Sequence, residues 1–219
     1  TTGPTGSGKT TTLYAILSKL NEPNTKIITL EDPVEYKLAG IVQSQVSSER
    51  VSEGGGGKNV YTFSKGLKAI LRQDPDIVMV GEIRDLETAE TAVDAALTGH
   101  MMLSTLHTNS AAGSIPRFLS MGVKPFLLAP SLNAVIGQRL ARRLCKECKV
   151  EDNDLDEKIL KIVMDSLESI SPKSGQKIED LKNVKFYKAK GCDKCGDIGY
   201  KGRVGVYEIM TMSPAIEKL

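Results

Sequence analysis

The sequence has few aromatic residues and no long apolar segment. Phe, Tyr and Trp make up 5% of the 219 residues, whereas proteins that bind single-stranded nucleic acid use aromatic side chains as stacking platforms. No apolar run approaches the roughly 18 residues needed to span a bilayer, and the first residues lack the basic and then apolar pattern of a secretion signal. We therefore expect a cytoplasmic protein.

The sequence also lacks a strong excess of either charge. Its 29 basic and 27 acidic residues give a net charge of +2, so no global field favours nucleic acid or an acidic membrane. Charge is concentrated locally, because five basic residues in 138–149 are followed by the acidic stretch 151–157. This pattern is typical of a solvated helix face followed by a polar loop.

Apolar runs alternate with amphipathic segments in the first half of the chain. The apolar runs are rich in β-branched residues and lack polar alternation, as expected for strands covered on both faces. The alternation predicts an α/β fold with a mostly parallel sheet and helices on both faces. Strands are expected at 26–30, 76–80 and 101–106, and helices at 10–20, 63–74 and 86–97.

Two stretches interrupt this pattern. Segment 48–59 holds four consecutive glycines, which indicate a mobile surface loop because ordering them costs much chain entropy. Segment 145–200 is polar and rich in lysine, and apolar sequence resumes at 202–210. We therefore expect a core at 1–144, an inserted module at 145–200 and a return to the core at 201–219.

The segment that begins at Gly3 matches a phosphate-binding loop, G-x-x-x-x-G-K-[ST]. Its glycines let backbone N–H groups surround phosphate oxygens, and the following helix adds the positive end of its dipole. Lys9 would contact the β- and γ-phosphates of ATP, and the Thr10 hydroxyl would take one Mg²⁺ position. The predicted nucleotide-binding residues are Gly3, Pro4, Thr5, Gly6, Ser7, Gly8, Lys9, Thr10 and Thr11.

Candidate catalytic groups follow the predicted strands. Glu31 follows the first strand, Glu82 follows the second after one glycine, and His107 closes the third. The carboxyl ends of parallel strands are where α/β enzymes place ligands, so these three side chains are candidates to act on a bound nucleotide. Asp85 is expected to cap the next helix, and His100 to be structural.

All four cysteines occur in two C-x-x-C pairs, with 43 residues between the pairs. Two thiolate pairs at this spacing can complete the tetrahedral coordination of Zn²⁺. A disulfide pair is disfavoured in a cytosolic protein, and a redox-active motif would need one pair. The pattern predicts a zinc site formed by Cys145, Cys148, Cys192 and Cys195.

Four segments in this order carry a family resemblance: GPTGSGKTTTLYA, ITLEDPVEY, LRQDPDIVMVGEIRD and TGHMMLSTLHTNSA. They closely resemble the Walker A loop, Asp box, Walker B segment and His box of the bacterial ATPases of type II secretion and type IV pilus assembly. These ATPases are hexameric motors with a RecA-like P-loop core. The resemblance covers roughly residues 1–144 and 202–212.

The resemblance implies roles for individual residues. Glu82 would activate water, Glu31 would assist directly or through Mg²⁺, and His107 would contact the γ-phosphate. The tetracysteine module is similar to that of assembly and export members, whereas retraction members lack it. The implied cofactors are ATP, Mg²⁺ and Zn²⁺.

The resemblance further implies an ATP-hydrolysing homo-hexamer that powers pilin or pseudopilin assembly. It would lie at the inner face of the cytoplasmic membrane, with the membrane platform and cytosolic adaptor proteins as partners, no nucleic acid and only indirect membrane contact. We expect the chain to be a fragment of the motor. The strand before the loop, the arginine fingers and the terminal helices would lie outside it, so the fragment alone would hydrolyse little ATP.

Two other functions remain open at this stage. A RecA-like core with a zinc knuckle and a basic helix at 138–149 would suit a nucleic-acid-binding or DNA-uptake module. A small-molecule kinase is the other alternative, although the sequence has no obvious arginine-rich lid.

Overall fold

The computed structural model describes residues 1–46, 61–171 and 184–216. The glycine-rich stretch expected to be a mobile loop, 48–59, lies outside the described residues. The chain forms two compact units. One comprises Thr1–Leu140 and Gly205–Leu219, and the other comprises Ala141–Val204. In the part of the chain that the structure describes, no helix is long and apolar enough to cross a membrane.

The first unit contains a four-stranded parallel sheet. Its strands are β1 (Ile27–Glu31), β2 (Val42–Gln45), β3 (Ile77–Val80) and β4 (Met101–Ser104), in the order β2-β1-β3-β4. The three predicted strands are confirmed, whereas β2, which is short and polar, was not predicted. In register, Leu30 pairs with Val80 and Val80 with Ser104, so the residues that follow these strands lie at one edge of the sheet.

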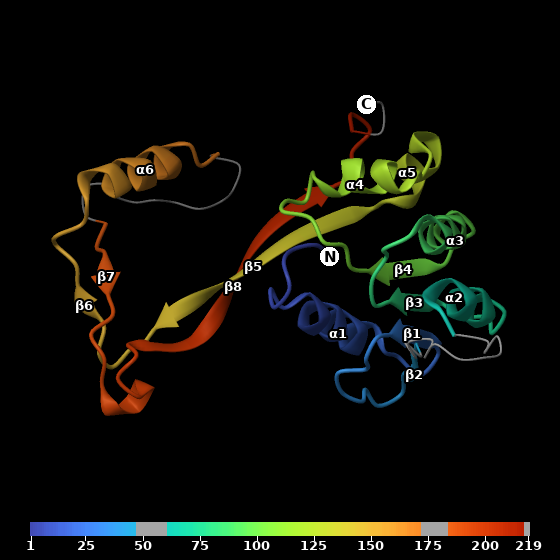
Figure 1. The fold of residues 1–219 in the computed structure, drawn as a ribbon, viewed down its shortest axis with the longest axis horizontal. Helices are drawn as coiled ribbons and strands as arrows, with labels where there is room; N and C mark the ends of the chain where they lie inside the picture. The colour runs from blue at the N-terminus through green and yellow to red at the C-terminus, as the bar shows by residue number, and fades with distance from the viewer. Residues whose placement is uncertain (47–60, 172–183, 217–219) are drawn as a thin grey trace, which may run out of the picture. The chain divides into compact units, whose positions relative to one another are not determined.

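Helices cover both faces of this sheet, as Figure 1 shows. Helix α1 (Lys9–Leu20) covers one face, and α2 (Phe63–Leu71) and α3 (Leu86–Leu97) cover the other. Successive strand residues point to opposite faces. Ile27, Ile77 and Met79 accordingly pack with α1, and Ile28, Leu30, Val78 and Val80 pack on the other side. The predicted α/β layering is confirmed.

The expectation of a basic helix at 138–149 is wrong. After α4 (Ser114–Met121) and α5 (Pro125–Ser131), the chain enters strand β5 (Ala134–Leu144), which forms a two-stranded sheet with β8 (Tyr200–Thr211). Leu140 and Leu144 have the four-residue spacing of a helix, but pairing with β8 and with Thr2, which bridges Gly137, stabilises the extended form. These partners are far away in the sequence, so local periodicity could not reveal them.

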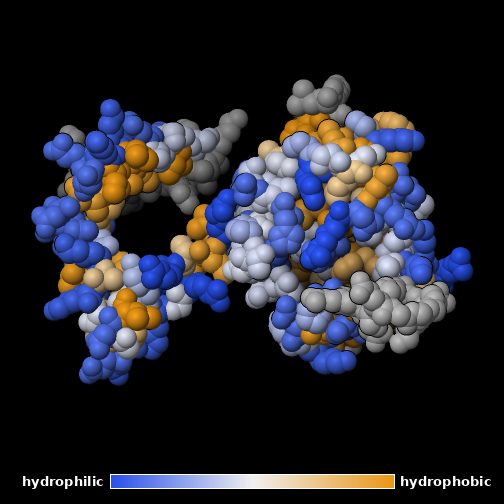
Figure 2. Space-filling view, in the orientation of Figure 1, coloured by the Kyte–Doolittle hydropathy of each residue, from blue (hydrophilic) through white to orange (hydrophobic). Residues whose placement is uncertain are grey.

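The second unit contains little regular structure. Strands β6 (Val150–Glu151) and β7 (Tyr187–Lys188) pair antiparallel, and a short 3₁₀ helix, η3, spans Asp193–Cys195. Helix α6 (Glu157–Glu168) has no buried residue, and Figure 2 shows apolar side chains gathered along it. Two of them, Ile159 and Ile162, are 53% and 65% exposed.

Candidate nucleotide site and tetracysteine cluster

The glycine-rich loop connects the sheet to helix α1. Thr2 forms parallel bridges with Leu106 and with Gly137, which brings the loop beside the end of β4. The loop ends at Gly8, the N-cap of α1, which adopts a left-handed conformation with φ of 87°. No side chain caps this helix. Since the first N–H groups of a helix have no acceptor within it, they remain available to a ligand.

Lys9 lies within the loop. Its ammonium donates hydrogen bonds to the carbonyl oxygens of Gly3 at 2.9 Å and of Pro4 at 3.1 Å. Burial lowers the pKa of Lys9, and the negative charge of Glu82 opposes that shift. The two hydrogen bonds hold the Lys9 ammonium against the loop. Lys9 also lines the adjacent cavity, where its positive charge can attract an anion.

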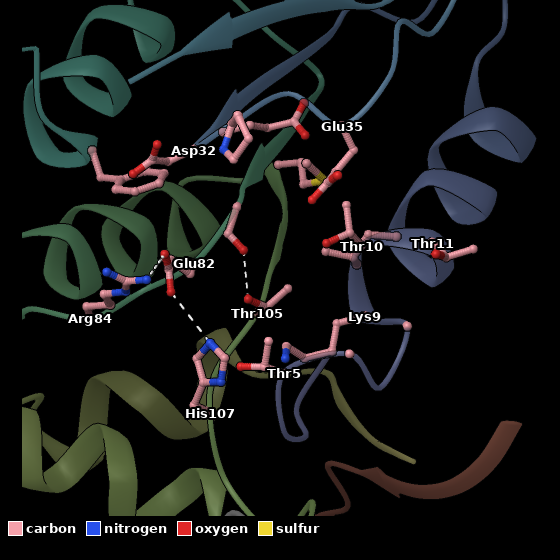
Figure 3. Close-up of a pocket in the computed structure, with 18 of the residues that line it drawn as sticks. Thr5, Lys9, Thr10, Thr11, Asp32, Glu35, Glu82, Arg84, Thr105 and His107 are labelled. Carbon is pink, nitrogen blue, oxygen red and sulfur yellow. Dashed lines mark hydrogen bonds and ion pairs between the residues drawn. The ribbon is translucent and has the colours of Figure 1, made fainter. Parts of the chain in front are cut away.

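A cavity of about 520 Å³ opens beside the loop. Figure 3 shows Thr10 and Glu82 facing this space from opposite sides, with Lys9 and His107 nearby. Gly3, Pro4 and Ser7 belong to the loop but lie outside the cavity lining. The predicted site residues that line the cavity are Thr5, Gly6, Gly8, Lys9, Thr10, Thr11, Glu31, Glu82 and His107.

Glu82 lies between two basic side chains. Its Oε1 lies 2.5 Å from an Arg84 guanidinium nitrogen, and its Oε2 lies 3.6 Å from Nε2 of His107. The Glu82 side chain is only 12% exposed, whereas that of Arg84 is 70% exposed. The carboxylate therefore lines the cavity as an anion-type group whose orientation is fixed by an exposed guanidinium.

His107 remains neutral at physiological pH in this environment. Burial and the nearby charge of Lys9 lower the pKa of His107, and Glu82 only partly offsets them. A neutral imidazole can donate one hydrogen bond and accept another. His100 lies elsewhere, with Nδ1 3.1 Å from the carbonyl oxygen of Ala95 at the end of α3, as expected for a structural histidine.

Two hydroxyl groups connect the ends of β3 and β4 next to Glu82. The Ser104 hydroxyl donates to the Val80 carbonyl, and the Thr105 hydroxyl donates to the Gly81 carbonyl, both at 2.7 Å. On the far side of Glu82, Asp85 accepts a hydrogen bond from the Thr88 N–H at 2.9 Å and caps α3, as predicted. The backbone on both sides of Glu82 is thus fixed.

The structure reveals three site residues that sequence reasoning did not assign. Arg84 lay in a recognised motif, but its pairing with Glu82 depends on side-chain geometry. Tyr14 donates to the Glu31 carboxylate from α1, and only its placement one turn after Thr10 hinted at a role. Gln138 of β5 accepts a hydrogen bond from the Thr12 hydroxyl at 2.9 Å, a contact between distant segments.

The four cysteines converge in the second unit. All four Sγ atoms lie within 4.8 Å of one another, and the measured pairs are 4.0 Å for Cys145–Cys192, 3.8 Å for Cys148–Cys195 and 3.7 Å for Cys192–Cys195. Four thiolates about 2.3 Å from a tetrahedral Zn²⁺ would lie about 3.8 Å apart, whereas a disulfide needs about 2.05 Å. The cluster fits a tetrahedral metal ion.

Backbone donors surround one of these sulfur atoms. The N–H groups of Cys192 and Gly199 donate to Sγ of Cys195 at 3.3 and 3.2 Å. Although burial opposes ionisation, these hydrogen bonds lower the pKa of Cys195 to about 7. A metal ligand must be deprotonated, so the donors favour the ligand form of this thiol.

Known proteins are similar in sequence to this chain along its whole length. A model of the type II/IV secretion system protein family matches residues 1–219. The chain is 49% identical to the type II secretion system ATPase E of Vibrio cholerae and to the type IV pilus assembly ATPase PilB of Myxococcus xanthus. Both matches cover 100% of this chain, which spans 39% and 35% of the relatives' own lengths.

A solved structure shares the fold. The crystal structure of the pilus retraction motor PilT with bound ADP matches 99% of this chain and 48% of its own, with a TM-score of 0.63 and 29% sequence identity. With the family match over residues 1–219, the shared fold leads to one conclusion: the chain belongs to the type II/IV secretion system protein family.

Proposed function

We propose that this chain forms the ATP-hydrolysing part of a motor that drives pilin or pseudopilin assembly. The single observation that carries the proposal is the convergence of Lys9, Glu82 and His107 on one cavity, next to an uncapped helix N-terminus. Such a site provides donors for phosphates, a base for water and an uncharged hydrogen-bonding group. In this proposal, the core is a RecA-like P-loop domain.

Each side chain then has a distinct role. Lys9 and the first N–H groups of α1 hold the phosphates, and Glu82 accepts the proton of the attacking water. Neutral His107 donates to the terminal phosphate without adding a charge. The oxygen atoms of Thr10 and Glu31 are the ligand types that Mg²⁺ prefers, so the residues present fit this ion, which would neutralise phosphate charge.

The tetracysteine cluster is proposed to bind one structural Zn²⁺. Four protein ligands leave no open position for a substrate, as is typical of structural zinc sites. Among the residues of the second unit that the structure describes, few side chains besides these cysteines are buried, and a metal ion would supply the stability that a small apolar core cannot.

The assembled machine is also part of the proposal. The relatives are named as secretion and pilus assembly ATPases. In this proposal the chain belongs to a homo-hexamer at the cytoplasmic face of the membrane, with the membrane platform and adaptor proteins as partners. The relatives' names give no support to a nucleic-acid-binding or DNA-uptake function. The basic residues that suggested it lie largely on strand β5.

The decisive experiment is Glu82→Gln in the full-length protein. We expect ATP binding to persist and the rate of phosphate release to fall by about 10²- to 10⁴-fold, the range for loss of a positioned base. Glu87→Gln is the matched control, since Glu87 is an exposed carboxylate on α3 paired with Lys68 at 2.7 Å. Wild-type turnover in Glu82→Gln would overturn the assignment.

A further inference from the structure

The carboxylate of Glu31 is buried at the end of β1. Glu31 is 2% exposed, and its side chain accepts hydrogen bonds from three donors. The Tyr14 hydroxyl donates to Oε2, while the Thr29 hydroxyl at 2.5 Å and the Gln43 amide at 3.2 Å donate to Oε1. A buried charge is unfavourable unless it is hydrogen-bonded, so these donors keep the carboxylate in the cavity wall.

Tyr14 connects this carboxylate to the helix that begins at the glycine-rich loop. Thr10 and Tyr14 are four residues apart on α1, and residues at this spacing lie on the same face of a helix. The side chains of Thr10 and Tyr14 therefore lie on the same face of α1, one helical turn apart. Figure 3 shows Thr10 directed into the cavity from α1. Tyr14 thus links α1 to the end of β1 through one hydrogen bond.

The environment of Tyr14 keeps it a rigid donor. Its side chain is 1% exposed, and its ring makes an edge-to-face contact with Tyr36 at a centroid distance of 4.6 Å. The hydroxyl has the Glu31 carboxylate as its acceptor, and the packed ring holds it in that direction.

The number of donors leaves Glu31 one acceptor position. An ionised carboxylate offers about four lone-pair positions, and Tyr14, Thr29 and Gln43 occupy three of them. The remaining position suits one further donor, such as a water molecule on a hydrated Mg²⁺, an ion that usually keeps several waters. Glu31 is therefore better arranged to accept a hydrogen bond from such a water than to wrap around the metal.

We propose that Tyr14 is a positioning residue that holds Glu31, opposite Thr10, to receive the hydrated divalent cation of a bound nucleotide. This inference rests on the proposed nucleotide-binding function. It differs from a packing role because the hydroxyl, rather than the ring, is the essential group. Groups that hydrogen-bond to the ligands of a metal are typically worth about 10- to 100-fold in metal affinity. Tyr14 acts through such a group, so its hydroxyl should contribute less than this full amount.

The test is Tyr14→Phe in the full-length protein, which removes the hydroxyl and keeps the buried ring. Mn²⁺ is the probe, and its binding to the ADP-loaded protein is followed by electron paramagnetic resonance. We expect Mn²⁺ affinity to fall several-fold, by up to about 10-fold, while ADP affinity measured in EDTA stays unchanged. Tyr61→Phe is the matched control, since its hydroxyl bonds Ser44 at 3.1 Å, and it should leave both affinities unchanged.

A double-mutant cycle separates positioning from general stability. If Tyr14 acts through Glu31, then Tyr14→Phe should cause no further loss of Mn²⁺ affinity in a Glu31→Gln background. Fully additive losses would overturn the inference, as would wild-type Mn²⁺ affinity in a folded Tyr14→Phe protein. Should Tyr14→Phe fail to fold, Gln43→Met decides: it removes another donor at a half-buried position, and unchanged Mn²⁺ affinity there counts against the inference.

The two proposals fail separately in this design. A wild-type protein that binds Mn²⁺ and ADP but releases no phosphate contradicts the ATPase proposal and leaves the test of Tyr14 intact. A wild-type protein that hydrolyses ATP, with Mn²⁺ affinity unaffected by Tyr14→Phe, contradicts only the role of Tyr14.

Discussion

Glu82 and His107 face each other across the ends of adjacent strands, with Oε2 of the glutamate 3.6 Å from Nε2 of the histidine. The side chains come from segments 25 positions apart in sequence, and the strand register brings them together. The imidazole of His107 therefore lies within the electrostatic field of the Glu82 carboxylate.

The first prediction concerns His107. Burial and Lys9 lower the pKa of His107, so its imidazole should titrate below the ordinary value of about 6.5. The folded pKa lies below the unfolded one, and the associated stability is therefore present above about pH 6.5 and lost as the pH falls toward the folded pKa. NMR titration of the two histidines, with His100→Gln to assign them, measures the shift. A pKa at or above 6.5 would contradict the prediction.

A second prediction separates stability from catalysis at Arg84. Its guanidinium pairs with Glu82 at 2.5 Å but is 70% exposed, and exposed ion pairs contribute about 0–1 kcal/mol. Arg84→Gln should therefore change the free energy of unfolding by less than about 1 kcal/mol, while the rate of ATP turnover falls because the Glu82 carboxylate loses the side chain that orients it. Denaturant unfolding and a phosphate-release assay test the two parts. A large loss of stability with unchanged turnover would contradict this role.

The third prediction concerns Gly8. A side chain there would adopt a left-handed conformation, with φ of 87°, and its Cβ would lie 2.8 Å from Nε2 of Gln138. Gly8→Ala should weaken ATP affinity by about 10-fold, because the methyl group displaces the Gln138 side chain and the left-handed backbone that directs the first N–H groups of α1 becomes strained. Gly99→Ala is the control, since Gly99 also has a positive φ, of 101°, but has nothing within 4 Å of the added Cβ. Both changes carry a backbone strain of roughly 1–2 kcal/mol, and only the first should affect ATP binding, as measured by titration calorimetry.

The fourth prediction concerns the tetracysteine cluster. The purified protein should contain one Zn²⁺ per chain by elemental analysis, and Co²⁺ substitution should give the absorption of a tetrathiolate site. Cys148→Ser should lose the metal and increase proteolysis within 141–204, because metal binding and folding are coupled in such modules. Retention of a full equivalent of zinc in Cys148→Ser would contradict the assignment of this ligand.

Much of the first unit could be predicted from the sequence because its signals are local. β1, β3 and β4 are mostly apolar runs, and the glycine-rich loop and α1 follow each other directly. The ends of parallel strands then implied that Glu31, Glu82 and His107 would lie at one edge. Each of these steps needs only a few consecutive residues and the general geometry of a parallel sheet.

The remaining features depend on contacts between distant segments. Strand β5 had helical spacing, and only pairing with β8 and Thr2 stabilises the extended form. Glu31 was expected to act on Mg²⁺, but its burial and its three donors depend on side chains from α1, β1 and β2. Such interactions depend on the tertiary fold, and a single sequence contains no local pattern that reveals them.

The hydroxyl bridges from Ser104 and Thr105 to the carbonyls of Val80 and Gly81 have a mechanical consequence. They extend the connection between β3 and β4 past the last ladder pair, so the backbones that carry Glu82 and His107 form one stiff body. If a nucleotide binds as proposed, a displacement of His107 would therefore be transmitted to Glu82 through peptide groups as well as through side chains.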